Sequence, residues 1–130
     1  MAKEHKKFWT NERLEKAKAL NMTPAQVYTL ASIVHKETVK ADERPRVAGA
    51  YLNRINQDMP LQADPTVIYA IKETTGDFDQ VIKRVGGSNL FVKSPYNTYI
   101  NKGLPPGPIA MPDISAIDAV LNAEKHDYIY

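Results

Sequence analysis

Glu37 is the residue whose position most clearly suggests chemistry. It stands near the end of the stretch TPAQVYTLASIVHKET, residues 23–38, which opens with a Thr-Pro-x-Gln capping signal and continues with apolar residues at helical spacing. At about 100° per residue, Glu37 lies at the margin of the apolar face, one turn after Ile33 and two turns after Leu30. A carboxyl group there is partly desolvated, which disfavours its charged form and makes it a usable proton donor near neutral pH. Glu37 is therefore the candidate general acid.

Two plainer interpretations accompany this one. A glutamate near a helix end is commonly a solvated or salt-bridged surface group, and Lys40 or Arg44 could pair with Glu37. His35 lies on the other flank of the apolar face and could act as a base or a ligand. With no second His or Cys at ligand spacing, a half-exposed structural histidine fits His35 better, and no metal site is expected.

Composition limits the classes of protein to consider. A chain of 130 residues with 43% hydrophobic content can hold one ordinary core, so we expect a single domain. The net charge is +2 and basic residues are interleaved with acidic ones, which does not favour nucleic acid as a partner. The absence of cysteine excludes disulfides and thiolate catalysis. No run of about 18 apolar residues occurs, so we expect a soluble chain, excised from a larger one if the protein is membrane-anchored or exported.

The elements that would position Glu37 are mostly helices. Asp42 and Asp64 have the pattern of N-caps, Ser115 begins a Ser-x-x-Asp capping box, and DYIY at 127–130 is typical of the start of a strand. We expect helices near 11–20, 24–38, 43–56, 65–73 and 115–123. The expected core residues are Val27, Leu30, Val34, Val47, Tyr51, Leu52, Ile55, Val67, Ile71 and Leu121. The predicted fold class is α+β: a compact, predominantly helical single domain with a small β element near the C-terminus.

The chain divides by composition into a tail and a main domain. Residues 1–22 are expected to form a mostly polar tail with a short helix, and residues 23–130 the domain itself. Between residues 90 and 111 the domain carries prolines and glycines close together, so regular structure is not expected there. About twenty irregular residues inside a small domain are more often functional than idle.

Several motifs follow one another in an order that points to a family. They are ASIVHKET at 31–38, RVAGAYLNRI at 46–55, MPLQADPTVIYA at 59–70, SPYNTYINKGLPPGPIAMP at 94–112 and the terminal YIY. Over roughly residues 24–130, this series resembles the catalytic domain of the endolytic murein transglycosylases, also called the MltG or YceG-like family. The resemblance rests on the fixed order of the motifs, because no single one would suffice.

The resemblance implies an activity and a setting. Members of that family are anchored in the inner membrane, with this domain on the periplasmic side, and cut peptidoglycan glycan strands without water, leaving a 1,6-anhydro-muramyl end. It implies the β-1,4 bond between MurNAc and GlcNAc as the target, glycan strands and the cell-wall synthesis machinery as partners, and no cofactor. The catalytic glutamate of the family matches Glu37.

The resemblance also implies a set of residues that bind the glycan. They are Gln62, Asp64, Tyr96, Asn97, Thr98 and Tyr99. Amide and hydroxyl groups suit sugar hydroxyls and N-acetyl groups, and tyrosine faces pack on sugar rings. Structural interpretations stay open, since Asp64 could only cap a helix and Asn97 could only hold a turn. We expect Gln62, Asp64, Tyr96 and Asn97 to surround one cleft with Glu37.

Three departures from the family pattern bear on these expectations. Many relatives carry an acid where this chain has His35, so that position is not the essential one by this resemblance. The anchor helix and the LysM-like domain that usually precede this region are absent from the chain as given. Relatives also continue past the terminal strand with a segment that contains a His and a Phe, and we expect the cleft to be incomplete without it.

Other functions remain to be separated from lytic cleavage. Hydrolysis of a glycosidic bond ordinarily needs two carboxyl groups, whereas a lytic enzyme can use the substrate's own 6-hydroxyl as nucleophile and manage with one. A hydrolytic muramidase and a glycan-binding module without turnover are therefore the alternatives. Some relatives have carried the label aminodeoxychorismate lyase, a pyridoxal-phosphate activity, but no lysine stands in a recognisable setting for that cofactor.

Overall fold

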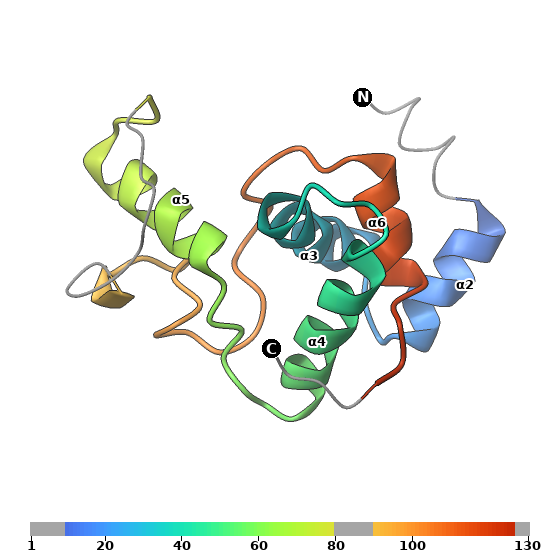
Figure 1. Ribbon diagram of the computed structural model, residues 1–130. Helices are drawn as coiled ribbons and strands as arrows, with labels where there is room; N and C mark the ends of the chain where they lie inside the picture. Colours follow the sequence, from blue (N-terminus) through green and yellow to red (C-terminus); the bar gives the residue numbers. More distant parts are fainter. Residues whose placement is uncertain (1–9, 80–89, 127–130) are drawn as a thin grey trace.

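The protein is described by a computed structural model that covers residues 10–79 and 90–126. Within these ranges the chain forms five helices: α2 (Asn11–Ala19), α3 (Pro24–Glu37), α4 (Arg44–Asn56), α5 (Asp64–Thr75) and α6 (Ile114–Leu121). Helix α3 lies at the centre and touches each of the other four (Figure 1). The five predicted helices are therefore confirmed in order and in approximate extent.

Helix α3 begins and ends where its sequence directs. The Thr23 hydroxyl accepts a bond from the Gln26 amide at 3.2 Å, and the Gln26 side chain accepts one from the Thr23 amide at 2.9 Å, which completes the predicted capping box. At the other end Thr38 is extended, with φ −144° and ψ 138°, so Glu37 is the last helical residue. The helix thus presents Glu37 at its C-terminal end.

The burial of α3 is wider than one apolar stripe. Its interior positions include Thr29, Ser32 and Ile33, each 5% exposed or less. The two hydroxyls are satisfied within the helix, since Thr29 donates to the Ala25 carbonyl and Ser32 to the Thr29 carbonyl. Residues 29–34 are all buried, so the middle of α3 is surrounded by other parts of the protein. The prediction of a single buried face on this helix is therefore wrong.

The expected core is otherwise confirmed. Val27, Leu30, Val34, Tyr51, Leu52, Val67 and Leu121 are buried, and Val47, Ile55 and Ile71 are half-buried. Small residues bring the helices together, with Ala31 of α3, Ala48 of α4 and Ala116 of α6 all fully covered. Such residues allow the helices to approach one another closely.

Three of the predicted helix caps are wrong. Glu43, not Asp42, precedes α4, and it already has helical dihedral angles, with no side-chain bond to the helix. Ala63 rather than Asp64 is the N-cap residue of α5. Asp113 precedes α6, where the predicted box at Ser115 does not form. Two of these polar groups bond instead to residues distant in the sequence, Asp64 to Tyr99 and Ser115 to Arg44.

The segment after α6 crosses α4 at Gly49. The Glu124 amide donates to the Pro45 carbonyl at 3.0 Å, and the Asn53 side chain donates to the His126 carbonyl at 2.7 Å. A Cβ atom on Gly49 would collide with the Glu124 carbonyl and the His126 ring. Gly49 is therefore required by this close crossing, not by its own dihedral angles.

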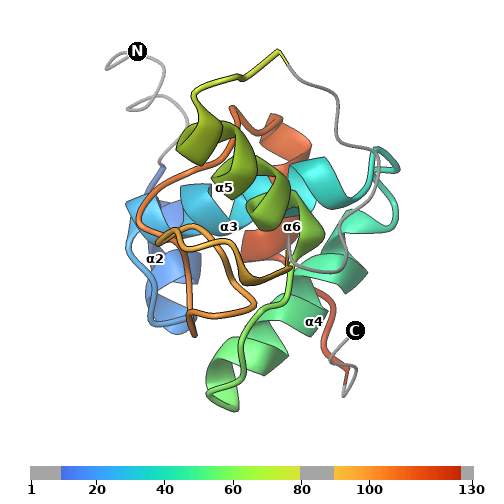
Figure 2. The same ribbon diagram turned by 90° about the vertical axis from the view of Figure 1, so that its left-hand side faces the viewer.

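Helix α5 stands apart from the others and contacts α3 alone among the described helices. Figure 2 shows it in front of α3, next to the irregular chain that follows residue 90. It ends at Gly76, whose φ of 76° is the left-handed conformation of a helix C-terminus. This offset places the start of α5 opposite the end of α3.

The predicted α+β class is wrong for the part of the chain that the structure describes, where every regular element is a helix. The expected strand at 127–130 lies outside the described residues. The irregular region from residue 90 onward forms no sheet because its backbone groups bond to side chains, chiefly those of Asn97 and Asn101. No described helix combines the length and the apolar character needed to cross a bilayer.

Candidate active site

Glu37 is joined by Tyr51 at the meeting point of α3 and α4. The Tyr51 hydroxyl donates a hydrogen bond to the Glu37 carboxylate. Desolvation by surrounding protein raises the pKa of Glu37 above its ordinary value of 4.5, the Tyr51 hydrogen bond opposes this rise, and the charge of Asp64 adds to it. The residue as a whole is nevertheless exposed. Glu37 can therefore meet a ligand while its protonated form is favoured.

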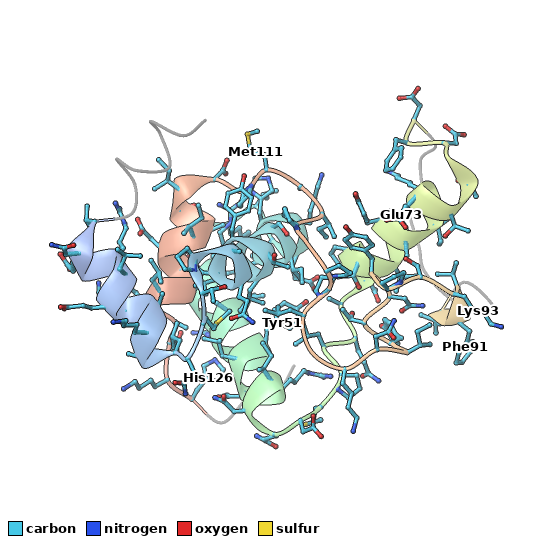
Figure 3. The ribbon with its side chains drawn as sticks, turned by 180° about the vertical axis from the view of Figure 1, so that it is seen from behind. Tyr51, Glu73, Phe91, Lys93, Met111 and His126 are labelled. Carbon is cyan, nitrogen blue, oxygen red and sulfur yellow. The ribbon has the colours of Figure 1, made fainter. Side chains whose placement is uncertain are left out.

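Tyr51 was expected only as a core residue, and its ring is indeed buried, with 8% of the residue exposed. Figure 3 shows it on α4 near the middle of the molecule. Burial, followed by the charge of Glu37 and the hydrogen bond to it, raises the pKa of Tyr51 far above its ordinary value of 10. The hydroxyl stays protonated and acts as a fixed donor. A tyrosine on a buried helix face usually has a polar partner, which is the signal that could have indicated this role.

A second acid faces the same place from α5. The Tyr99 hydroxyl donates to Asp64 Oδ1 at 2.6 Å. Burial, then the bond to Asp64 and the charges of Asp64 and Glu37, raise the pKa of Tyr99 to about 12. Because Asp64 and Glu37 both act electrostatically on Tyr99, and Asp64 acts on Glu37, the structure brings these three predicted residues together.

Arg54 completes the charged group and was given no role from the sequence. Its Nη1 donates to the Pro60 carbonyl at 3.0 Å and to Gln62 Oε1 at 3.3 Å, and its charge lowers the pKa of both Tyr51 and Tyr99. Gln62 has a φ of 52°, a left-handed conformation that costs roughly 1–2 kcal/mol for a residue with a side chain. The available signal was the spacing of Arg54, one turn after Tyr51 on α4.

Asn97 and Thr98 are buried behind this group, with 0% and 1% of their surfaces exposed. Asn97 Nδ2 donates to the carbonyls of residues 90 and 92, and its Oδ1 accepts from the Tyr99 amide at 2.9 Å. Thr98 Oγ1 accepts from the Ala63 amide at 2.9 Å and lies 2.8 Å from the Thr66 hydroxyl. These contacts tie the irregular chain to the start of α5 and set the direction of Tyr99.

Tyr96 takes part in a different set of contacts. Its ring packs against Tyr69 of α5, with centroids 4.7 Å apart and planes inclined by 58°. Its hydroxyl lies beside Gly107, where an added Cβ would be 3.6 Å away. The structure therefore brings Glu37, Asp64, Tyr99 and Gln62 into one group and holds Tyr96 by aromatic packing against α5.

One hollow on the surface lies away from this group. A cavity of about 520 Å³ lies between the first half of α3, the end of α4 and residues 103–106, and Glu37 does not line it. Among the described residues, no cluster of three or more His, Asp or Glu side chains has the spacing of a metal site.

The sequence of the whole chain, residues 1–130, matches the profile of the YceG-like family. The chain belongs to the YceG-like family. The resemblance expected from the ordered motifs is thereby confirmed.

Relatives of this YceG-like chain include two proteins named endolytic murein transglycosylase. That of Streptococcus pneumoniae serotype 2 is 38% identical over 115 residues, 87% of this chain and 20% of the relative. That of Bacillus subtilis is 40% identical over 105 residues, 81% of this chain and 27% of the relative. A crystal structure of a yceG-like protein from Listeria monocytogenes has a TM-score of 0.79 and 37% identity, covering 92% of this chain and 37% of that one. The chain thus spans about a fifth to a quarter of the curated relatives.

Proposed function

We propose that this YceG-like chain is the catalytic domain of a lytic transglycosylase. It cleaves the β-1,4 bond between MurNAc and GlcNAc inside peptidoglycan glycan strands and leaves 1,6-anhydroMurNAc ends. The observation that carries the proposal is Glu37, an accessible carboxyl group whose pKa is raised by desolvation and which Tyr51 holds by a hydrogen bond. The names of the relatives, endolytic murein transglycosylase, agree with this substrate.

Glu37 acts in both halves of the reaction. In its protonated form it transfers the proton to the glycosidic oxygen as the bond to the muramyl C1 breaks. As carboxylate it then accepts the proton of the muramyl 6-hydroxyl, whose oxygen forms the new bond to C1. The 6-hydroxyl belongs to the substrate, so its proximity replaces the second carboxylate that a hydrolase needs. The Tyr51 hydrogen bond stabilises the carboxylate between the two steps.

Asp64 contributes charge. Desolvation is the main cause of the raised pKa of Glu37, and the Asp64 carboxylate adds to it. The same charge favours the positive charge that develops on the sugar ring as the bond breaks. The presence of this second acid is also the observation that favours a hydrolytic muramidase as the other candidate function. Its hydrogen bond from Tyr99 and its place on α5, opposite Glu37, are compatible with either activity.

The remaining predicted site residues divide into two roles in this proposal. Gln62, Tyr96 and Tyr99 are exposed or half-exposed and contact the glycan. Asn97 and Thr98, whose polar groups bond within the protein, position the chain that carries Tyr99. The whole protein, in this proposal, works on peptidoglycan outside the cytoplasm, anchored in the membrane and alongside the cell-wall synthesis machinery.

Mass spectrometry of the products tests the proposed function. Purified protein and its Glu37→Gln variant are incubated with isolated sacculi, and the released muropeptides are weighed. Lytic cleavage gives anhydro products, which are lighter than the products of a muramidase by one water for each cut. Hydrated ends that depend on Glu37 would establish the muramidase instead. Binding to sacculi without any release would leave only a glycan-binding module.

A further inference from the structure

Arg44, at the first position of α4, is the one charged side chain among the described residues that is buried, with 3% of its surface exposed. Burying an ion costs several kcal/mol unless its donors are satisfied. Nε donates to the Thr38 carbonyl at 3.0 Å, and Nη1 donates to Asp113 Oδ2 at 3.3 Å and to the Ser115 hydroxyl at 2.6 Å. Nη2 lies 3.5 Å from Nδ1 of His35. All three nitrogens of the guanidinium group are therefore engaged.

The Arg44 bond to Thr38 acts on the end of the helix that bears Glu37. Terminal residues of helices fray, because the last carbonyl groups have no partner within the helix. The Thr38 carbonyl accepts from Arg44, and the Thr38 hydroxyl bonds to Glu43 Oε2 at 3.1 Å and accepts from the Lys40 amide at 3.2 Å. The residue that follows Glu37 is thus held at both of its oxygen atoms.

Two side chains of α4 contact the end of α3. One bonds to Glu37, the last helical residue, and the other bonds to Thr38, the C-cap. Arg44 and Tyr51 are seven residues apart, so they lie on the same face of α4 about two turns from each other. Arg44 holds Thr38 and Tyr51 holds Glu37. Both contacts therefore come from the same helix, one to the backbone beside Glu37 and one to its carboxyl group.

The guanidinium group of Arg44 also bonds to residues at the start of α6. Asp113 and Ser115 stand at the start of α6, and the Asp113 amide donates to His35 Nδ1 at 3.3 Å. The same nitrogen lies 3.5 Å from Asp113 Oδ2. His35 therefore belongs to the cluster that anchors α3, on the side of the helix away from the Asp64 and Tyr99 pair.

We propose that Arg44 is a positioning residue for Glu37. Its planar fork joins the end of α3 to the start of α6, so that the carboxyl group keeps one place against Tyr51 during proton transfer. General acid catalysis depends on such placement, and an error of about 1 Å can cost roughly 10²-fold in rate. The inference deepens the proposed function and rests on it.

The test replaces the planar guanidinium group of Arg44 and keeps the positive charge at this position. Arg44→Lys supplies an ammonium group that cannot bond to Thr38 and to Asp113 with Ser115 at the same time. We expect kcat on sacculi to fall about ten- to a hundredfold with KM little changed. We also expect the pKa of Glu37, measured by carboxyl ¹³C NMR, to move toward its ordinary value as the group gains water. Arg13→Lys is the matched control, because Arg13 makes a two-point bond to Asp118 of α6 away from Glu37.

The outcomes separate positioning from simple stabilisation. Normal kcat and an unchanged pKa of Glu37 in Arg44→Lys, with only a lower Tm, would overturn the inference, as would equal changes in the Arg13→Lys control. Should Arg44→Lys fail to fold, Ser115→Ala removes a single exposed partner of the fork and should lower kcat about threefold. An unchanged kcat in that variant would then overturn the inference. The NMR titration needs no substrate, so it also distinguishes failure of Arg44 positioning from failure of the proposed activity.

Discussion

Two regions face each other across Glu37, and they are stabilised by different forces. The helical body, made of α2, α3, α4 and α6, is held by apolar side chains such as Leu30 and Val34, which have no exposed surface. The Asn97 loop, residues 90–101, is held to α5 by buried polar groups, chiefly those of Asn97, Thr98 and Thr66. The body carries the acid, and the loop with α5 carries Asp64 and Tyr99.

This difference shows how the two regions act on one carboxyl group. Apolar packing is non-directional, and its effect on Glu37 is desolvation, the largest cause of the raised pKa. A polar network is directional, and through Tyr99 it fixes where the charge of Asp64 lies. The body therefore raises the pKa of Glu37 by desolvation, and the loop adds to this rise by holding the charge of Asp64 in place.

Removing the proton of Glu37 should have the largest effect on activity. Glu37→Gln keeps the size of the side chain and an acceptor for the Tyr51 hydroxyl, but it can neither give nor take a proton. We expect the cleavage rate to fall by at least about 10²–10⁴, because both proton transfers depend on this group. Release of anhydro-muropeptides from sacculi measures the loss, next to active wild-type protein. Retained cleavage would remove Glu37 from the mechanism.

The same variant should be more stable than the wild type at neutral pH. The folded-state pKa of Glu37 is raised, so its favourable contribution to stability is complete below its ordinary value of 4.5 and is lost as the pH rises through the folded-state value. The glutamine side chain of the variant does not titrate and carries no such dependence. Denaturant unfolding at pH 4 and pH 7 should show a gain for Glu37→Gln only at the higher pH. An equal difference at both pH values would contradict the raised pKa.

A cavity in the helical body should cost the most stability. Leu30→Ala empties a fully buried position on α3, and we expect the free energy of unfolding to fall by about 2–5 kcal/mol. Leu14→Ala, on the partly exposed face of α2 with 37% of the residue exposed, should cost clearly less. Urea denaturation followed by circular dichroism compares the two variants. Equal losses would mean that the body is not packed as described.

Breaking the polar network should cost less than the cavity. Thr98→Val leaves the buried Ala63 amide without its acceptor, which we expect to lower the free energy of unfolding by about 1–3 kcal/mol. Thr74→Val is the control, because the Thr74 hydroxyl bonds to a helix carbonyl at an exposed position, and it should change stability by less than about 0.5 kcal/mol. Similar urea midpoints for both variants would show that the network contributes nothing.

Neutralising Asp64 should shift a pH profile without abolishing cleavage. Asp64→Asn removes a charge that raises the pKa of Glu37, so that pKa falls and the alkaline limb of the rate profile moves to lower pH. A decrease of one pKa unit would reduce the rate at neutral pH by about tenfold. The pKa of Tyr99 should move from about 12 toward 10, which ultraviolet titration detects.

Asp58→Asn provides the control for this shift. Asp58 pairs with Lys102 at 3.4 Å, and its side chain is 86% exposed. We expect both the rate profile and the Tyr99 titration to remain as in the wild type. A shift of equal size in both variants would indicate a general effect of net charge, and Asp64 would lose its specific role.

His35→Ala should have the smallest effect on activity. His35 bonds to Asp113 and lies next to Arg44, away from the Tyr51 contact of Glu37, so it takes no part in proton transfer. We expect the cleavage rate to fall by less than about tenfold, below the usual range for loss of a general acid or base. A loss equal to that of Glu37→Gln, at an unchanged Tm, would mean that His35 shares the chemistry.

Local sequence signals were sufficient for the helical body. The capping box at Thr23 and the apolar spacing that follows it predicted the start of α3 and the place of Glu37 at its far end. These signals succeed because cap bonds and helical periodicity involve residues only three or four positions apart. The ordered motifs added the family, but periodicity did not indicate how the Asn97 loop would fold.

Tertiary structure decided which polar groups meet. Ser115 does not form its predicted capping box because α6 already begins at Ile114, and its hydroxyl accepts instead from Arg44, 71 positions earlier. Asp64 bonds to Tyr99, 35 positions later, and Tyr51 turns from an expected core residue into the partner of Glu37. A local pattern lists the bonds that a side chain could make, whereas packing determines which partner arrives within about 3 Å. For that reason the sequence indicated Glu37, and the family resemblance indicated Asp64, while the roles of Tyr51 and Arg44 beside Glu37 appeared only in the folded chain.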